Sequence, residues 1–347
     1  MVKNNSKKLT VGSLFAGIGG ICLGFRNAGF ELLWANELDK HACETYRLNF
    51  PEHKLYEQDI QEIRHPEQLG VVDVITSGFP CQAFSVAGYR RGFKDDRGNL
   101  FFDTARFIDA IKPQAYLLEN VKNLKGHDNG RTLEIIRGVL SEDLGYSFIP
   151  FVLNSKDYGN VPQNRERIYI VGFRAEAKGG HYTDTFYPPE PIPLTKNIWD
   201  VLDPALEESK YYYTERFKNY SMLESAMKSK STIYQWRRKY VRENKSNVCP
   251  TLTANMGTGG HNVPLVRDRQ GIRKLTPLEC ARFQGFPETF EFPNDMADSH
   301  CYKQAGNSVV VPVIQRIAEE MRATLCSDRS NFLRNGEQRR GQLRLPM

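Results

Sequence analysis

Short apolar runs alternate with helical stretches through the first half of the chain, and this alternation restricts the possible folds more than any other feature. We expect strands at residues 9–15, 30–36, 71–77, 115–119 and 167–173, and helices at residues 19–28, 39–50 and 132–144. The β-branched run at 71–77 suits a strand buried on both faces. Strands that alternate with helices favour a parallel sheet with right-handed crossovers. The sequence therefore predicts a doubly wound, mostly parallel α/β domain.

Length and composition set the outer limits of the chain. Its 347 residues, of which 40% are hydrophobic, are enough for one large core and a smaller one, because single cores stop growing at about 250 residues. No apolar run reaches the roughly 18 residues of a membrane span, and no apolar segment follows the basic start as in a signal peptide. The seven cysteines are scattered without a CxxC pair, which argues against disulfides and zinc. We expect a cytoplasmic protein with no metal.

The second half of the chain differs from the first in its amino-acid pattern. Four prolines crowd into residues 188–193, and basic and aromatic residues interleave from 210 to 245. A stretch rich in Gly, Thr and Asn follows at 251–260. Order returns at 276–285, where Thr276, Pro277 and Glu279 form the pattern of a capped helix start, and a closing helix is expected at 309–325. Residues 327–347 are expected to be a disordered tail.

A glycine-rich turn directly follows the first expected strand. Residues 15–20 read Phe-Ala-Gly-Ile-Gly-Gly, which lets a ligand approach the backbone and the start of a helix. The turn alone is equally compatible with a purely structural role. Glu37 and Asp59, expected at the ends of the second and third strands, add acids that can bind ribose or adenine. Acids around the pocket favour S-adenosylmethionine over a phosphate-bearing cofactor such as NAD.

Cys81 differs from the other cysteines in its surroundings. It lies in the stretch Gly-Phe-Pro-Cys-Gln-Ala-Phe-Ser at residues 78–85, just after the buried strand 71–77. A lone cysteine is most often an inert buried residue. A loop at the ligand-binding edge of a sheet, made rigid by Pro80, instead allows the sulfur to face the pocket as a nucleophile.

Five ordered blocks together resemble the C5 cytosine-specific DNA methyltransferases. They are residues 15–20, 78–85, Glu-Asn-Val at 119–121, Gln-Asn-Arg-Glu-Arg at 163–167 and Gln-Ala-Gly-Asn-Ser-Val at 304–309. The resemblance covers nearly the whole chain except residues 174–271, and no catalytic position departs from the pattern. It implies the S-adenosylmethionine-dependent methyltransferase fold, with a smaller, irregular target-recognition domain in the unmatched section.

The resemblance implies covalent catalysis. A thiolate of Cys81 would add to carbon 6 of cytosine, which makes carbon 5 reactive. Glu119 would donate a hydrogen bond to ring nitrogen 3, although without Cys81 a carboxylate that caps a turn would be the favoured interpretation. Arg165 would contact the cytosine carbonyl, and Arg167 would support the loop; both could instead form weak surface ion pairs.

The resemblance also places the cofactor. Phe15 would pack on adenine, Glu37 would bind the ribose, and Asp59 the adenine amino group. The remaining expected cofactor-binding residues are Gly17, Gly19, Gly20, Leu38, Ile60, Pro80 and Asn307.

The target cytosine must leave the helix, because a stacked base does not expose carbon 6. Gln82 and Ser85 are candidates to fill the gap or hold the displaced phosphate. The basic and aromatic section could contact phosphates and base edges, or form a solvated charged face. The other expected DNA-binding residues are Arg237, Arg238, Thr251, Thr253, Gly257 and Gly259.

We predict a cytosine C5 DNA methyltransferase with a catalytic domain at 1–189, completed by 302–326, and a recognition domain at 190–301. Its expected partner is double-stranded DNA, with a cognate restriction endonuclease acting independently, in a monomeric bacterial or phage enzyme. The alternatives are an RNA methyltransferase, a catalytically inactive DNA-binding protein and an NAD-dependent dehydrogenase. The dehydrogenase lacks its glycine fingerprint and leaves Cys81 unexplained.

Overall fold

The computed structural model describes residues 8–80, 100–175, 185–204, 206, 208–237, 239–258 and 263–326. Its largest element is a seven-stranded sheet with the order β3-β2-β1-β4-β5-β8-β6. The strands are β1 (Thr10–Leu14), β2 (Glu31–Glu37), β3 (Lys54–Glu57), β4 (Val74–Ser77), β5 (Ala115–Val121), β6 (Ile149–Asn154) and β8 (Glu166–Phe173). Neighbouring strands from β3 to β5 run parallel, whereas β8 is antiparallel to both of its neighbours. The predicted doubly wound, mostly parallel sheet is confirmed.

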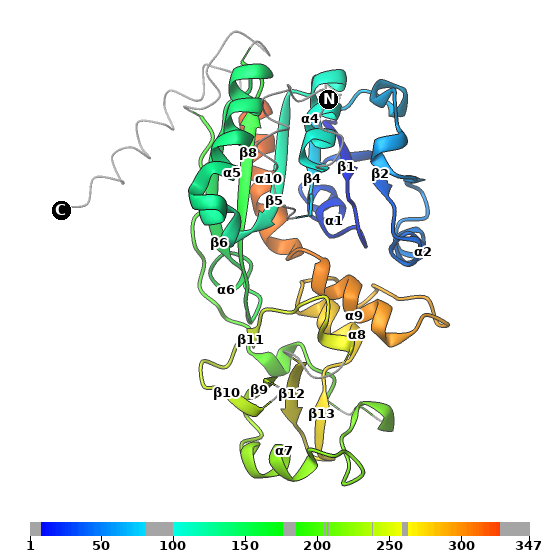
Figure 1. Ribbon diagram of the computed structural model, residues 1–347, viewed down its shortest axis with the longest axis vertical. Coiled ribbons are helices and arrows are strands. Elements are labelled where there is room, and N and C mark those ends of the chain that lie inside the picture. Colours follow the sequence, from blue (N-terminus) through cyan, green and yellow to red (C-terminus); the bar gives the residue numbers. More distant parts are fainter. Residues whose placement is uncertain are drawn as a thin grey trace, which may run out of the picture.

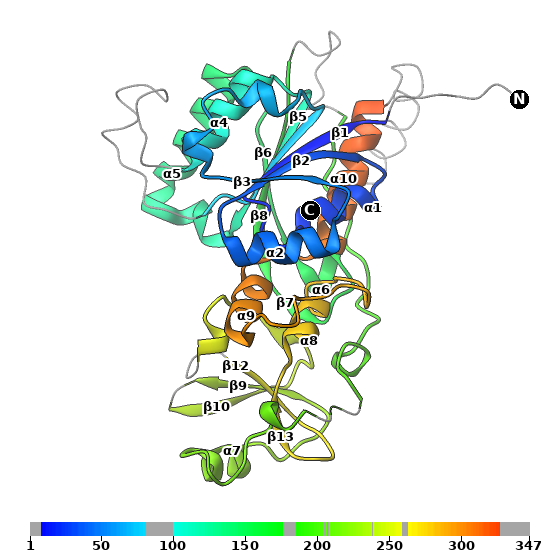
Figure 2. The same cartoon turned by 90° about the vertical axis from the view of Figure 1, so that its right-hand side faces the viewer.

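Helices cover both faces of this sheet (Figures 1 and 2). One face packs against α4 (Leu100–Ile111) and α5 (Arg131–Arg137), with Phe107 and Ile136 fully buried. The other face packs against α1 (Gly20–Asn27) and α10 (Val311–Cys326), where Phe25 and Ile314 share one core. The closing helix α10 therefore lies beside the first helix of the chain.

Two helices start at side chains that cap them, and one of these is the predicted start at Thr276. The Asp39 side chain accepts hydrogen bonds from the backbone N–H groups of His41 and Ala42 at the start of α2 (Lys40–Asn49). Thr276 and Glu279 form a reciprocal capping box at the start of α8 (Pro277–Arg282). The predicted helix 132–144 is α5, which continues as a π-helical turn at Gly138–Asp143. No helix in the described part of the chain is long and apolar enough to cross a membrane.

A second, smaller sheet forms the other end of the molecule (Figure 1). It is antiparallel, with the order β10-β9-β12-β13. Its elements are β9 (Ile233–Arg237), β10 (Tyr240–Asn244), β12 (Val263–Arg267), β13 (Ile272–Lys274) and the nearby helix α7 (Tyr220–Ala226). Between the two sheets lie α8 and α9 (Asp298–Asn307).

Two short strands connect the large sheet with the smaller part of the molecule. The strand β7 (Gln163–Asn164) pairs in parallel with β11 (Cys249–Pro250). The Gln163 side chain donates to the Phe283 carbonyl at 2.6 Å and accepts from the Leu252 N–H at 3.1 Å. A buried amide thus ties together three segments that are far apart in the sequence.

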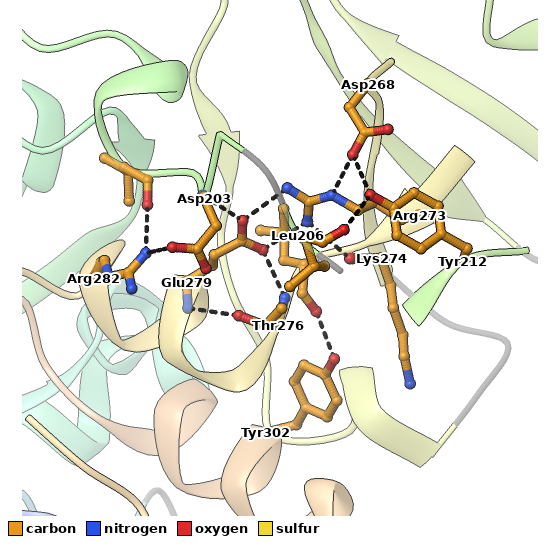
Figure 3. Close-up of polar contacts among 12 residues, drawn as sticks. Asp203, Leu206, Tyr212, Asp268, Arg273, Lys274, Thr276, Glu279, Arg282 and Tyr302 are labelled. Carbon is orange, nitrogen blue, oxygen red and sulfur yellow. Dashed lines mark hydrogen bonds and ion pairs between the residues drawn. The ribbon is translucent and has the colours of Figure 1, made fainter. Parts of the chain in front are cut away.

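A buried ionic cluster attaches α8 to the smaller sheet (Figure 3). Arg273 on β13 donates from its two terminal nitrogens to the two carboxylate oxygens of Glu279, each at 2.8 Å. Its Nε donates to Asp268 at 2.8 Å. Because Arg273 and Glu279 are both fully buried, each charge depends on the other for its compensation.

Candidate active site

A cavity of about 430 Å³ lies where the first, second, fourth and fifth strands end. Ligands bind at this edge in open α/β sheets, where the direction of winding reverses. The wall combines the glycine-rich turn with side chains from the ends of β2 and β5 and with the end of α9 and the two residues after it. Among the residues with expected roles, the cavity is lined by Phe15, Gly17, Gly20, Glu37, Pro80, Glu119, Arg165, Arg167 and Asn307.

The glycine-rich turn is fixed by a carboxylate. Phe15 and Gly17 both adopt positive φ, at 52° and 56°, and Gly17 N–H donates to Oε2 of Glu37 at 2.8 Å. The other oxygen of Glu37 accepts the N–H groups of Leu38 and Asp39, each at 2.8 Å. Three backbone N–H groups, one from the turn and two that follow β2, thereby hold the Glu37 carboxylate in a single orientation at the cavity wall.

Glu119 is a buried acid that faces two arginines. Its side chain, on β5, forms an ion pair with Nε of Arg167 on β8, at 3.1 Å. Burial raises the pKa of Glu119 above its ordinary value, while the positive charges of Arg167 and Arg165 act in the opposite direction. A carboxyl group with a raised pKa can carry a proton near neutral pH and donate it in a hydrogen bond.

Arg165 is committed to backbone carbonyl groups. It is 3% exposed, and its terminal nitrogens donate to the carbonyls of Leu252, Gly306 and Ser308 at 2.8, 3.1 and 2.5 Å. Since the carbonyls of Gly306 and Ser308 lie at the C-terminal end of α9 and that of Leu252 follows β11, Arg165 joins three parts of the chain. We expected Arg165 to contact the cytosine and Arg167 to support the loop; in the structure Arg165 binds backbone carbonyls, and Arg167 pairs with Glu119.

Asn120 has a role that the sequence did not reveal. Its side-chain nitrogen donates to the Phe79 carbonyl at 2.9 Å, and its side-chain oxygen accepts Val121 N–H at 2.8 Å. The end of β5 therefore fixes the backbone that leads to Pro80. The sequence offered one signal for this role, the asparagine in the block 119–121. Only the fold shows that its side chain reaches the backbone of Phe79.

Some expected cofactor residues do not line the cavity formed by the described residues. Asp59 accepts the Gln61 N–H at 2.9 Å and caps a 3₁₀ turn, Leu38 is 61% exposed and Ile60 is buried. Gly19 lies against Phe50, since a Cβ there would be 2.3 Å from its ring. Cys81, Gln82, Ser85, Arg238 and Gly259 lie outside the described residues.

Three of the residues expected to bind DNA, Arg237, Thr251 and Thr253, line a second cavity, of about 330 Å³. Gly257 has a different environment, because a Cβ at that position would be 2.6 Å from the ring of Tyr302. Its lack of a side chain allows close packing on α9. Among the described residues, no cluster of three or more His, Cys, Asp or Glu side chains could hold a metal ion.

The fold and the cavity define a doubly wound enzyme with a nucleoside-type pocket and a buried acid beside it. Residues 9–323 match the family of C-5 cytosine-specific DNA methylases. The type II methyltransferase M.Bsp6I of Bacillus sp. is 59% identical over 317 residues, which is 90% of this chain and 98% of that protein. The type II methyltransferase M.NlaX of Neisseria lactamica is 40% identical over 90% of this chain and 96% of its own length.

A solved structure shows the same fold. A mutant of Spodoptera frugiperda DNMT2 superposes with a TM-score of 0.69 at 20% identity, covering 92% of this chain and 100% of that one. This chain belongs to the C-5 cytosine-specific DNA methylase family. It is a DNA (cytosine-5-)-methyltransferase, and its methyl donor is S-adenosylmethionine.

Proposed function

We propose that this enzyme methylates a cytosine flipped out of a specific double-stranded DNA sequence, with Cys81 as the covalent nucleophile. The observation that carries the proposal is the buried Glu119–Arg167 pair on a cavity wall that also includes Pro80, the residue before Cys81. An acid and a guanidinium at this position suit a pyrimidine ring whose nitrogen 3 and carbonyl oxygen must be polarised. The protein would be the modification enzyme of a bacterial restriction-modification system, cytoplasmic and monomeric, beside a separate endonuclease.

The reaction begins with addition of the Cys81 thiolate to carbon 6 of the cytosine. As the C–S bond forms, electrons of the 5,6 double bond move through the ring, and the carboxyl group of Glu119 donates its proton toward nitrogen 3. Carbon 5 is then electron-rich enough to form a bond to a methyl group, whose bond to the sulfur of the methyl donor would break at the same time. Loss of the proton from carbon 5, taken up by a water-borne base, expels the thiolate, returns the nitrogen 3 proton to Glu119 and restores the aromatic ring.

The five buried cysteines in the described part of the chain are poor candidates for this step. Burial raises the pKa of Cys43 to about 12 and of Cys301 to about 11. Cys22, Cys249 and Cys280 are also buried with raised pKa values, in each case first because of desolvation. Such thiols carry almost no thiolate at neutral pH.

The described residues fit S-adenosylmethionine. Gly17 has no atom within 4 Å of the place where a Cβ would be, so a ligand can approach its backbone. Phe15 would pack on the adenine, the fixed carboxylate of Glu37 would accept the ribose hydroxyls, and Asn307 would lie at the methionine end of the cavity. When bound, S-adenosylmethionine supplies an electrophilic methyl group.

We propose that the smaller part of the molecule, residues 190–301, recognises the DNA sequence. Arg237, Thr251 and Thr253 face one cavity in it, and such side chains bind phosphates and base edges. Gln82 and Ser85 would occupy the space of the flipped cytosine, at an unstacking cost of a few kcal/mol.

A duplex that carries 5-fluorocytosine at the target position is expected to trap the enzyme. Fluorine replaces the proton that must leave carbon 5, so Cys81 is not eliminated and the adduct persists. Denaturing electrophoresis with cofactor present would show the adduct, and peptide mapping would locate it at Cys81. An adduct at a different cysteine, or none while ordinary DNA is methylated, would contradict the proposed mechanism.

Substitutions of the two arginines separate their roles. Arg167→Ala is expected to lower kcat on the order of 100-fold, as for removal of a donor to a developing oxyanion, and to cost less stability than Arg165→Ala, because the buried Glu119 that loses its partner can take up a proton. Arg165→Ala leaves three backbone carbonyls without their donor, and is expected to lower the free energy of unfolding by about 2–3 kcal/mol. Single-turnover methylation and urea unfolding measure both effects. A stable, inactive Arg165→Ala protein beside an active Arg167→Ala protein would restore the assignment expected from the sequence.

A further inference from the structure

The second cavity lies beside the strand pair β7–β11 and is lined almost entirely by polar side chains. Its lining includes Arg237, Thr251 and Thr253, and also Gln235, Arg242 and Asn164, and contains no acidic residue among the described positions. Guanidinium and amide groups without carboxylates suit purine edges, because arginine pairs with guanine and glutamine with adenine in the major groove.

The hairpin β9–β10 presents these groups on one face. Arg242 lies directly opposite Gln235 in the antiparallel register, and Arg237 is two residues further along β9. Since side chains alternate along a strand, all three project to the same side. Tyr234 and Trp236 project to the other side, where they join a hydrophobic cluster with Leu265. The packing of these two rings fixes the orientation of the polar face.

Gln235 and Arg242 differ in the hydrogen bonds that they form within the protein. Gln235 is 6% exposed, and its side-chain oxygen accepts from Arg237 at 3.2 Å. Arg242 is exposed and has no hydrogen bond or ion pair to any residue that the structure describes. An exposed guanidinium held over a row of neutral polar groups is available for a ligand.

The cavity is directly connected to the catalytic side of the molecule. Asn164 lies in its wall, and the next residues, Arg165 and Arg167, line the cavity that holds Glu119. The Thr251 hydroxyl donates to the Asn164 carbonyl at 2.6 Å, which fixes the two cavities relative to each other.

We propose that Arg242, which lies opposite Gln235 on the hairpin, reads a guanine that flanks the target cytosine. The guanidinium would donate two hydrogen bonds, to O6 and N7 of the guanine. This inference rests on the proposed function, because it requires that duplex DNA lies across both cavities with the target cytosine in the first. The inference makes Arg242 a specificity-determining residue, and it requires a guanine at one position of the DNA recognition sequence.

Arg242→Ala tests the inference on a pool of duplexes in which every base is varied around the cytosine. Methylation is read by bisulfite sequencing. We expect the rate at wild-type sites to fall on the order of 10- to 100-fold, and the requirement for guanine to be lost at one position only. Arg242→Lys keeps the charge but lacks the paired donors, so it is expected to lose the same preference.

Arg269→Ala is the matched control. Arg269 is exposed on the β12–β13 turn, and its replacement removes the same positive charge. It is expected to keep the wild-type rate and sequence preference. A loss for Arg242→Ala that is equal for all sequences would indicate a phosphate contact and overturn the inference, as would an unchanged preference. Because Arg242 is exposed, thermal unfolding should match that of the wild type. Trapping wild-type enzyme on 5-fluorocytosine DNA tests the proposed function separately: an adduct beside an unchanged preference refutes only the guanine contact.

Discussion

Replacing Cys81 with serine is expected to abolish methyl transfer to DNA and to leave binding of S-adenosylmethionine nearly unchanged. A serine hydroxyl is almost entirely protonated at neutral pH and is a much weaker nucleophile toward carbon 6 than a thiolate. Losing a covalent nucleophile typically costs at least about 10⁴-fold in rate. Incorporation of a radiolabelled methyl group measures the reaction, and isothermal titration calorimetry measures cofactor binding.

Cys326→Ser provides the control for this experiment. Cys326 is exposed at the end of α10, so its replacement removes an accessible thiol without reaching the cavity. That variant should methylate DNA at the wild-type rate. Substantial methylation by Cys81→Ser would show that no thiol of this position takes part, and the roles proposed for Glu119 and Arg167 would then need another chemistry.

Much of the fold could be predicted because its signals are local. The apolar runs and glycines gave the alternation of strands and helices, and Asp39 and Thr276 mark helix starts by their own hydrogen bonds. The antiparallel direction of β8 could not be predicted in this way. An apolar strand carries no mark of its direction, and direction depends on the connection, here the short segment through α6 (Ser155–Tyr158).

The sequence predicted which residues form the site better than it predicted the role of each residue. The block 163–167 contains two arginines. Because their side chains are chemically identical, the sequence alone does not distinguish their roles. Arg165 meets its carbonyl partners 87 to 143 residues further along the chain, and only the assembled fold brings these groups together. The smaller antiparallel sheet was similarly hidden, because its strands are short and rich in basic and aromatic residues that also suit a loop.

The buried cluster between α8 and β13 leads to the second large effect. Glu279→Ala is expected to lower the free energy of unfolding by about 3–5 kcal/mol, because it leaves the fully buried Arg273 without its paired carboxylate. The same change also removes the acceptor for the N–H groups of Thr276 and Asp203. Urea unfolding monitored by circular dichroism measures the loss. Glu288→Ala, an exposed carboxylate with the same charge change, should shift stability by less than about 0.5 kcal/mol.

A paired replacement distinguishes the stranded charge from a simple loss of packing. Arg273→Met with Glu279→Leu removes both charges and keeps apolar volume, so it should recover part of the stability lost in Glu279→Ala. Recovery is incomplete because Asp268 also loses its bond to Arg273 Nε. If the double variant is as unstable as the sum of its single variants, the two side chains contribute independently, and the charge-compensation argument is wrong. Recovery would instead mean that Glu279→Ala is destabilising because the Arg273 guanidinium loses its paired charge. The attachment of α8 to the smaller sheet would then depend on the compensation of the Arg273 and Glu279 charges by each other.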